Sequence, residues 1–123
     1  MGIQFYILVA LGGGLGSVFR AFLGHFFNTH SFLSTLAANL CGAFLIGLLT
    51  RYGANLGSGD LFRAFWIIGI CGGFTTFSTF GMDIYNLGIK ESWTWLVAYI
   101  SANFLGSLIL IWLGFKTANL AIS

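Results

Sequence analysis

The chain has 123 residues, of which 58% are hydrophobic and only 7% are charged. A water-soluble domain carries about 25% charged residues, so the composition excludes a soluble globule and indicates a membrane protein. A bilayer-spanning helix needs roughly 20 apolar residues, and a chain of this length has room for about four of them. The net charge of +2 comes from scattered basic residues, so the chain has no basic patch for nucleic acid.

Four long apolar stretches predict four transmembrane helices. They run over approximately residues 3–27, 32–50, 62–88 and 93–115. The connections are short, so consecutive helices should be antiparallel neighbours and both termini should lie on one side of the membrane. We therefore predict an all-α membrane protein in which residues 1–123 form a single transmembrane domain.

The first helix carries closely spaced glycines. Gly12 and Gly16 are four residues apart and share a helix face, and Gly69 and Gly73 repeat this spacing in the third stretch. Small residues on one face allow membrane helices to approach closely and to pack by dispersion contacts. The glycine run does not match the dinucleotide-binding fingerprint, because Ser17 stands where the third glycine is needed. These glycines therefore indicate helix packing.

Uncharged polar residues follow one face of the second helix and one face of the fourth. Thr35 and Asn39 are four residues apart, as are Tyr99, Asn103 and Ser107. Polar groups inside a membrane face the protein interior or a wet pathway. Interhelical hydrogen bonds explain any one of these residues as well as a pathway does, but two such stripes in so short a chain favour a pathway. Each side chain offers a hydrogen-bond donor and none is charged, which suits an anion that must also leave.

The third stretch contains the segment GGFTTFSTF, from Gly72 to Phe80. Adjacent glycines followed by β-branched and hydroxyl residues disfavour an α-helix, so we predict a break in this helix. Non-helical backbone at membrane depth must be buried in protein or line a cavity, and its free carbonyls can coordinate a cation. Phe77 and Phe80 are three residues apart, so their rings can project the same way. Ring edges can face an anion, although ordinary packing also explains both rings.

Taken together, these segments resemble the small fluoride channels of the Fluc, or CrcB-like, family over essentially the whole chain. The matching segments are residues 12–20, 35–44, 72–80 and 103–107. The resemblance implies a dual-topology antiparallel homodimer, multi-pass in the cell inner membrane, with two parallel fluoride pathways and a structural sodium ion on the two-fold axis. It further implies passive fluoride efflux that lowers cytoplasmic fluoride, without an enzymatic reaction.

The resemblance also assigns roles to particular residues. The main-chain carbonyls of Gly72 and Thr75 would hold the sodium ion, and Arg20 would line an aqueous vestibule and attract anions. Asp83 stands where the family frequently has glutamate, which leaves open how far its carboxylate reaches toward the pathway. Asn39 would donate a hydrogen bond to fluoride, and Phe77 and Phe80 would line the pore. The fluoride pathway as a whole would include Thr35, Asn39, Thr76, Phe77, Ser78, Thr79, Phe80, Tyr99, Asn103 and Ser107.

The basic residues give only a weak signal for orientation. Arg51, Arg63 and Lys116 belong to the side of the predicted bundle that holds the termini. Lys90 belongs to the other side, for which Arg20, within the first helix, is a further candidate. This is a small bias under the positive-inside rule. It permits insertion in both orientations, as a dual-topology dimer requires, and it equally permits one weakly specified orientation.

Two rival interpretations compete with a channel. A small dual-topology multidrug transporter would also have four helices and dimerise, but proton-coupled exchange needs an acidic residue within the membrane. The first helix offers Arg20 and no Asp or Glu, which argues against this class. A non-transporting assembly subunit would not explain aligned neutral donors next to a broken helix.

Overall fold

The structure is a computed structural model that describes residues 1–28, 31–90 and 92–123. Over these residues the secondary structure is helical, and four segments are long and apolar enough to cross a membrane, so the predicted four-span helical fold is confirmed. Asp60–Lys90 counts as one span made of several consecutive elements. In chain order the elements are α1 (Ile3–His25), α2 (Ser31–Asn55), α3 (Asp60–Phe62), η1 (Arg63–Cys71), α4 (Gly72–Phe74), α5 (Ser78–Lys90) and α6 (Trp93–Ile122).

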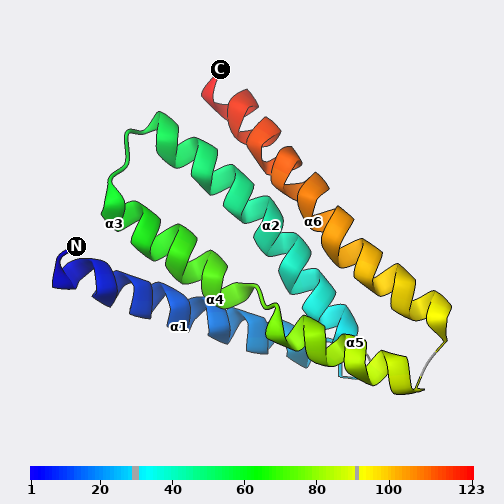
Figure 1. The fold of residues 1–123 in the computed structure, drawn as a ribbon. Coiled ribbons are helices and arrows are strands. Elements are labelled where there is room, and N and C mark those ends of the chain that lie inside the picture. The colour runs from blue at the N-terminus through cyan, green and yellow to red at the C-terminus, as the bar shows by residue number, and fades with distance from the viewer. Residues whose placement is uncertain (29–30, 91) are drawn as a thin grey trace.

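The bundle consists of two helix pairs. α1 packs along η1 and α4, whereas α2 packs along α6. α2 also contacts η1 and α5, and these contacts join the two pairs. Consecutive spans run in opposite directions, and both termini lie at the same end of the bundle (Figure 1).

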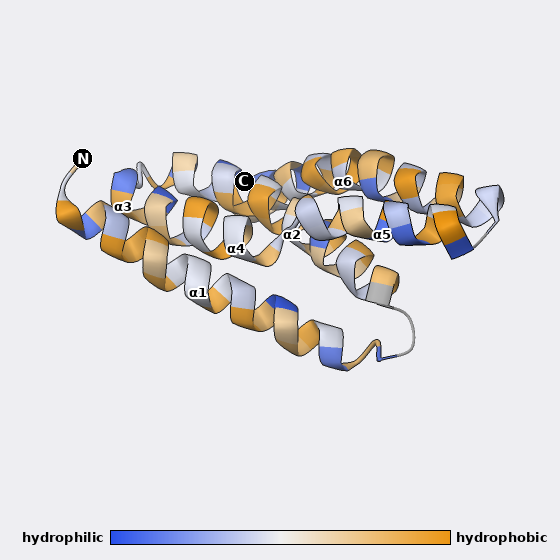
Figure 2. Cartoon of the chain, turned by 60° about the horizontal axis from the view of Figure 1, so that its bottom comes forward, coloured by the Kyte–Doolittle hydropathy of each residue, from blue (hydrophilic) through white to orange (hydrophobic). Residues whose placement is uncertain are grey.

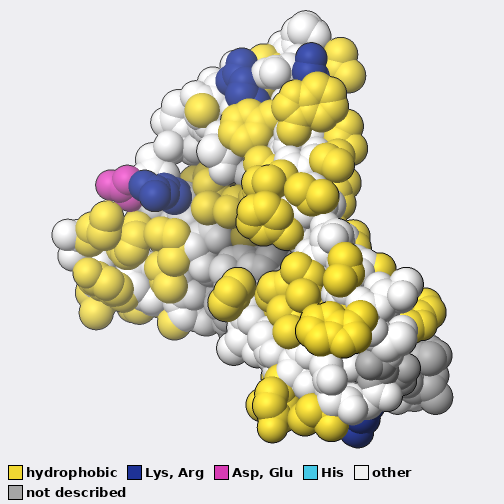
Figure 3. Space-filling model, turned by 45° about the vertical axis from the view of Figure 1, so that its right-hand side comes forward, with side chains coloured by type: hydrophobic (Ala, Val, Ile, Leu, Met, Phe, Trp, Pro, Cys, Tyr) yellow, Lys and Arg dark blue, Asp and Glu magenta, His cyan; other side chains and the backbone are white. Residues whose placement is uncertain are grey.

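The outside of the bundle is mostly apolar. Hydrophobic residues occur along all of the long helices in Figure 2, and hydrophobic side chains cover much of the face in Figure 3. Large side chains such as Phe22, Trp93 and Trp112 are exposed. Helices that are apolar all round belong in a lipid environment when they are not buried in a large core. The chain is a multi-pass membrane protein.

Two helices are longer than their apolar stretches predict. α2 continues to Asn55 rather than to residue 50, and α6 continues to Ile122 rather than to residue 115. Arg51 Nε donates to Asn119 Oδ1 at 2.6 Å, and the Lys116 ammonium lies 5.3 Å from the centre of the Trp112 ring. Long basic side chains can stay paired or reach toward water while the backbone remains helical. Hydropathy therefore marks where the apolar span ends, while the helix itself extends further.

The glycines of α1 confirm the predicted close packing of helices. A Cβ atom at Gly12 would overlap the carbonyl oxygen of Phe65, and one at Gly16 would overlap the carbonyl oxygen of Ile70. The packing is reciprocal, because a Cβ at Gly69 would lie 2.8 Å from the Cα of Gly12. The backbones of α1 and η1 are thus in direct contact, which only glycine permits at these positions.

We expect Gly12→Ala and Gly16→Ala to destabilise the protein by about 1–3 kcal/mol each, as is usual for overpacking a tight contact. Gly14→Ala is the matched control on the same helix, because a Cβ there meets nothing within 4 Å. The measurement is the midpoint of thermal unfolding in detergent. Equal midpoints for all three variants would contradict the packing described here.

Candidate functional site

The third span is interrupted near its middle. α4 ends at Phe74, Thr75 has an extended backbone (φ −82°, ψ 157°), and α5 begins at Ser78. The preceding η1 is a π-helix, a rare form that often occurs at functional sites. The N–H and Oγ1 of Thr75 both donate to the Cys71 carbonyl, at 3.0 and 2.9 Å. Since hydrocarbon offers no hydrogen bonds, the other polar groups of this segment need partners within the protein.

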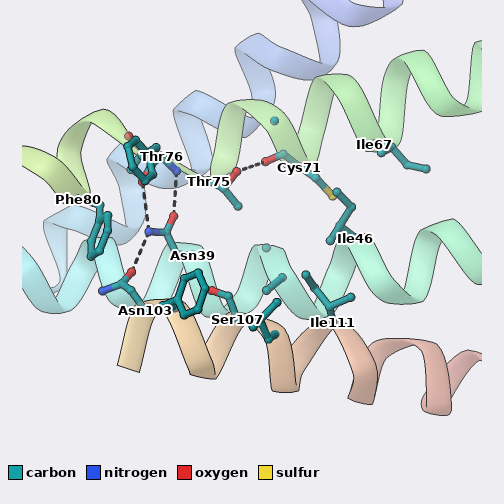
Figure 4. A pocket seen from close by; sticks show the side chains of 16 residues that line it. Asn39, Ile46, Ile67, Cys71, Thr75, Thr76, Phe80, Asn103, Ser107 and Ile111 are labelled. Atoms are coloured by element: carbon teal, nitrogen blue, oxygen red, sulfur yellow. Dashed lines mark hydrogen bonds between the residues drawn. The ribbon is translucent and has the colours of Figure 1, made fainter. Parts of the chain in front are cut away.

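Asn39 on α2 supplies two of these partners. Its Oδ1 accepts the Thr76 N–H at 2.9 Å, and its Nδ2 donates to the Thr76 carbonyl at 3.2 Å. The same Nδ2 donates to Asn103 Oδ1 on α6 at 2.9 Å (Figure 4). The Asn39 side chain thus bonds both backbone groups of Thr76, as a neighbouring strand would.

α1 supplies partners from the opposite side. Arg20 Nη1 donates to the Thr75 carbonyl at 3.1 Å, and Ser17 Oγ lies 3.4 Å from the Gly73 carbonyl oxygen. The Arg20 side chain is partly buried, and a guanidinium stays protonated in proteins. The structure therefore places a fixed positive charge beside the interruption.

The Thr76 side chain caps the start of α5. Its Oγ1 accepts the Thr79 N–H at 3.2 Å and donates to Thr79 Oγ1 at 3.1 Å. The Ser78 hydroxyl lies 3.4 Å away. An oxygen that accepts a first-turn N–H stabilises a helix start, so the hydroxyl-rich sequence ends the interruption and starts the next helix.

A buried hydrogen-bond network lies next to the interruption. The Tyr99 hydroxyl donates to Asp83 Oδ2 at 2.6 Å, and Asn103 Nδ2 donates to the Tyr99 carbonyl at 3.1 Å. The Thr35 side chain also lies within hydrogen-bonding reach of the Tyr99 side chain. Among the described residues, every buried side-chain nitrogen and oxygen has a partner. Asp83, at 7% exposure, therefore has its charge-bearing group paired inside the bundle.

A groove of about 410 Å³ runs between α2, η1 and α6 at the level of the interruption. Uncharged polar side chains line one part of it, and aliphatic residues such as Ile46, Ile67 and Ile111 line the rest (Figure 4). Phe77 lies at the edge of the groove, and its side chain is 83% exposed. Phe80 is partly buried, with its ring centre 5.7 Å from that of Phe77 and 5.6 Å from that of Tyr99.

The groove gathers most of the residues predicted from the sequence. Those lining it are Asn39, Gly72, Thr75, Thr76, Phe77, Phe80, Asn103 and Ser107. The others lie close by: Thr35 and Tyr99 in the buried network, Ser78 and Thr79 in the first turn of α5, and Arg20 on α1. The sequence leaves open how far Asp83 reaches toward the pathway, and in the structure its carboxylate accepts the Tyr99 hydroxyl. The available signal was a single acidic residue within an apolar stretch, which in a membrane requires a partner.

Main-chain carbonyls are the cation ligands that this region offers. Across the described residues, no three His, Cys, Asp or Glu side chains come together. A continuous helix would pair the Gly72 carbonyl with the N–H of Thr76, but that N–H bonds to Asn39 instead. The interruption thus releases the Gly72 carbonyl from its helical hydrogen bond.

Comparison with known proteins gives a consistent result. The family model described as "CrcB-like protein, Camphor Resistance (CrcB)" matches residues 7–115. The chain is 40% identical to a fluoride-specific ion channel FluC of Helicobacter acinonychis, over 82% of this chain and 85% of that protein. It is 40% identical to a fluoride-specific ion channel FluC 1 of Bacillus thuringiensis, over 93% and 87% of the two chains. It is 36% identical to a fluoride-specific ion channel FluC of Burkholderia pseudomallei, over 94% of this chain and 95% of that protein.

We expect Tyr99→Phe to lower the free energy of unfolding by about 1–3 kcal/mol, because it removes the hydroxyl that bonds the buried Asp83 carboxylate. Tyr85→Phe is the matched control, since Tyr85 lies on the same span as Asp83 but is 66% exposed. Thermal unfolding in detergent measures both variants. A Tyr99→Phe midpoint equal to that of the control would show that the network contributes nothing to stability.

Proposed function

Because the chain belongs to the family of CrcB-like proteins, we propose that it is a fluoride-selective ion channel that lowers cytoplasmic fluoride by passive efflux. Relatives that carry the name fluoride-specific ion channel support this proposal. The observation that carries it is the groove at the interrupted helix, where uncharged hydrogen-bond donors meet two phenyl rings.

The donors suit the chemistry of fluoride. Fluoride is small and holds its water tightly, so a selective pore must replace the hydration shell with donors at close range. Amide and hydroxyl groups donate without a fixed charge, so an ion bound to them can leave again. Asn103 and Ser107 present such groups along one face of α6 in the groove. Thr75 and Thr76 add hydroxyls from the interrupted span, and Asn39 completes this polar wall.

The two phenylalanine rings would contribute the rest of the pathway. The edge of a phenyl ring carries partial positive charge and can face an anion. Phe77 and Phe80 flank the groove with ring planes 59° apart, so the two edges do not point in one common direction. In this proposal an ion passes the ring edges one after the other.

Positive charge near the groove would offset the cost of bringing an anion into low dielectric. Arg20 carries one such charge and lies beside Thr75, where it would attract anions toward the pathway. Gly72 and Thr75 both line the groove, and in this proposal their carbonyls would hold a structural sodium ion. The Gly72 carbonyl fits this role because it has lost its helical partner. The Thr75 carbonyl has a second lone pair besides the one that accepts from Arg20.

A second copy of the chain would close the groove. The groove is partly open, and Phe77, which lines it, is largely exposed. We propose an antiparallel homodimer, in which the same face of both copies meets and two fluoride pathways form. The weak asymmetry between Arg51, Arg63 and Lys116 at one end and Lys90 at the other permits the insertion in both orientations that this dimer requires.

Passive conduction is sufficient for the proposed role. A membrane potential that is negative inside drives an anion outward, so export needs neither a nucleotide nor proton exchange. The buried Asp83 is bonded to Tyr99 and takes no part in the proposed transport step.

Purified protein in liposomes should release trapped fluoride and retain chloride, because the donors and ring edges form a pathway too narrow for the larger ion. Phe77→Ile and Phe80→Ile keep apolar bulk but lose the ring edge, so fluoride efflux should fall by at least tenfold while the elution volume of the protein stays normal. A fluoride electrode and a chloride electrode provide the two measurements.

Phe22→Ile is the matched control, because Phe22 is an exposed aromatic residue on α1 that does not line the groove. Chloride efflux as fast as fluoride efflux would overturn the proposed selectivity. Wild-type fluoride flux in both Phe77→Ile and Phe80→Ile would mean that the pathway lies elsewhere.

Single cysteines placed at each terminus should label from both sides of the cell membrane, since an antiparallel dimer contains both orientations. The measurement uses a membrane-impermeant thiol reagent on a variant in which Cys41 and Cys71 are replaced by Ala. Labelling of each terminus from one side only would rule out dual topology.

A further inference from the structure

We propose that a second cavity, between the end of α2 and the start of the third span, is a mouth of the fluoride pathway, and that Arg63 attracts anions into it. This proposal rests on the proposed function, because a pathway through the groove needs an opening to water at each end. Arg20 lies beside the interruption near the middle of the span, so it does not explain how an anion enters or leaves at the end of the bundle.

The cavity has a volume of about 360 Å³. It lies where the chain turns from α2 into α3, at the end of the bundle that holds both termini (Figure 1). Three polar side chains line it, those of Thr50, Ser58 and Arg63, and the other lining residues are apolar or glycine. One positive charge together with hydroxyl groups suits a small anion better than a cation.

The cavity continues the groove along the same two elements. Ile67 of η1 lines both of them. On α2, their lining residues follow one another at spacings of three or four positions from Asn39 to Gly53, so they share one helix face. The helix rises about 21 Å between these two residues, which exceeds half of the roughly 30 Å hydrocarbon thickness. Since Asn39 lies at the interruption, the cavity lies near the boundary between lipid and water.

Arg63 is the charged residue of this cavity. Its side chain is exposed, and among the described residues its guanidinium forms no hydrogen bond or ion pair. Asp60, three residues earlier, is not paired with it and does not line the cavity. Arg20 and Arg51, by contrast, each donate to an oxygen of another segment. A guanidinium stays protonated in proteins, and a positive charge at the entrance of a cleft raises the local concentration of anions.

The turn after α2 holds the cavity in shape. Gly57 has a φ of +62°, a left-handed conformation that favours glycine. The N–H and Oγ of Ser58 both donate to the Gly53 carbonyl, at 3.0 and 2.6 Å. A Cβ at Gly53 would lie 2.7 Å from a ring carbon of Phe62, so the start of the third span packs closely against the end of α2. These contacts fix the turn that returns the chain to Arg63, and the mouth needs no ligand to form.

Thiol reaction rates at position 50 test the attraction without relying on fluoride flux. Thr50→Cys is made in the variant in which Cys41 and Cys71 are Ala, and the protein is placed in phosphatidylcholine liposomes. Its rates of reaction with an anionic and a cationic methanethiosulfonate reagent are compared. Replacing Arg63 by Gln should lower the ratio of the anionic to the cationic rate about threefold or more, and high salt should reduce this difference.

Lys116→Gln is the matched control, because Lys116 is an exposed cation at the same end of the bundle that does not line the cavity. It should leave the ratio of rates unchanged. A ratio that is the same with Arg63 and with Arg63→Gln would overturn the proposal. A thiol at position 50 that neither reagent reaches would overturn it as well, because a mouth must be open to water.

Fluoride efflux then connects the mouth to transport. Well below saturating fluoride, Arg63→Gln should reduce efflux about threefold or more, and Arg63→Lys should restore most of it because the charge returns. At saturating fluoride the loss should nearly disappear, since capture of the ion no longer limits the rate. A merely structural role of Arg63 would lower efflux at all concentrations alike, and that result would contradict the proposal.

A second variant covers the case in which Arg63→Gln does not fold. Thr50→Cys keeps Arg63, and its efflux should fall after the anionic reagent has reacted but not after the cationic one; equal efflux after both would overturn the proposal. An effect of Arg63→Gln that appears only in liposomes containing phosphatidylglycerol would assign Arg63 to a lipid headgroup instead. Liposomes of the unmodified protein that release no fluoride would contradict the proposed function, whereas the thiol reaction rates would still decide whether the cavity attracts anions.

Discussion

The need to satisfy backbone hydrogen bonds inside a bilayer is the constraint on which this structure depends. A helix satisfies its own N–H and C=O groups, but residues 75–77 have left the helix and hydrocarbon supplies no replacement partners. The protein supplies them from three directions: Arg20 on α1, Asn39 on α2 and the Cys71 carbonyl at the end of η1. An interruption in the middle of the span is stable because these partners are already in place.

Close helix packing brings those partners within reach. Gly12 and Gly16 let α1 contact the backbone of η1, which places Arg20, one turn beyond Gly16, next to the Thr75 carbonyl. On the other side, a Cβ at Gly47 or Gly114 would overlap the facing backbone, so α2 and α6 are also in direct contact. Asn39 and Asn103 can then share a 2.9 Å hydrogen bond. The glycines thus contribute to the site by allowing the helices to approach closely, while the polar side chains provide its chemistry.

Some of the polar side chains that stabilise the fold also belong to the proposed pathway. The network runs from the buried Asp83 through Tyr99 and Asn103 to the partly buried Asn39, and its members are hydrogen-bonded to one another. Fully bonded networks of this kind rigidify a core and specify one arrangement. In the proposed channel, that rigidity keeps the donors and ring edges at the spacing of a small anion. The open side of the groove is where a second copy of the chain would complete the pathway.

The sequence by itself determined the membrane class, the four spans and the segment in which helix formation is unfavourable, because these follow from local composition and spacing. It also selected Asn39, Asn103 and Tyr99 as polar residues requiring an explanation. Only the tertiary structure decided that Asn39 bonds the Thr76 backbone, that Asp83 pairs with Tyr99 and that α2 and α6 extend past their apolar stretches. Each of these contacts joins residues from different helices, or depends on such a contact, as Arg51 with Asn119 illustrates. Residue spacing along one helix determines which side chains share a face, but the partner they meet depends on how the helices pack.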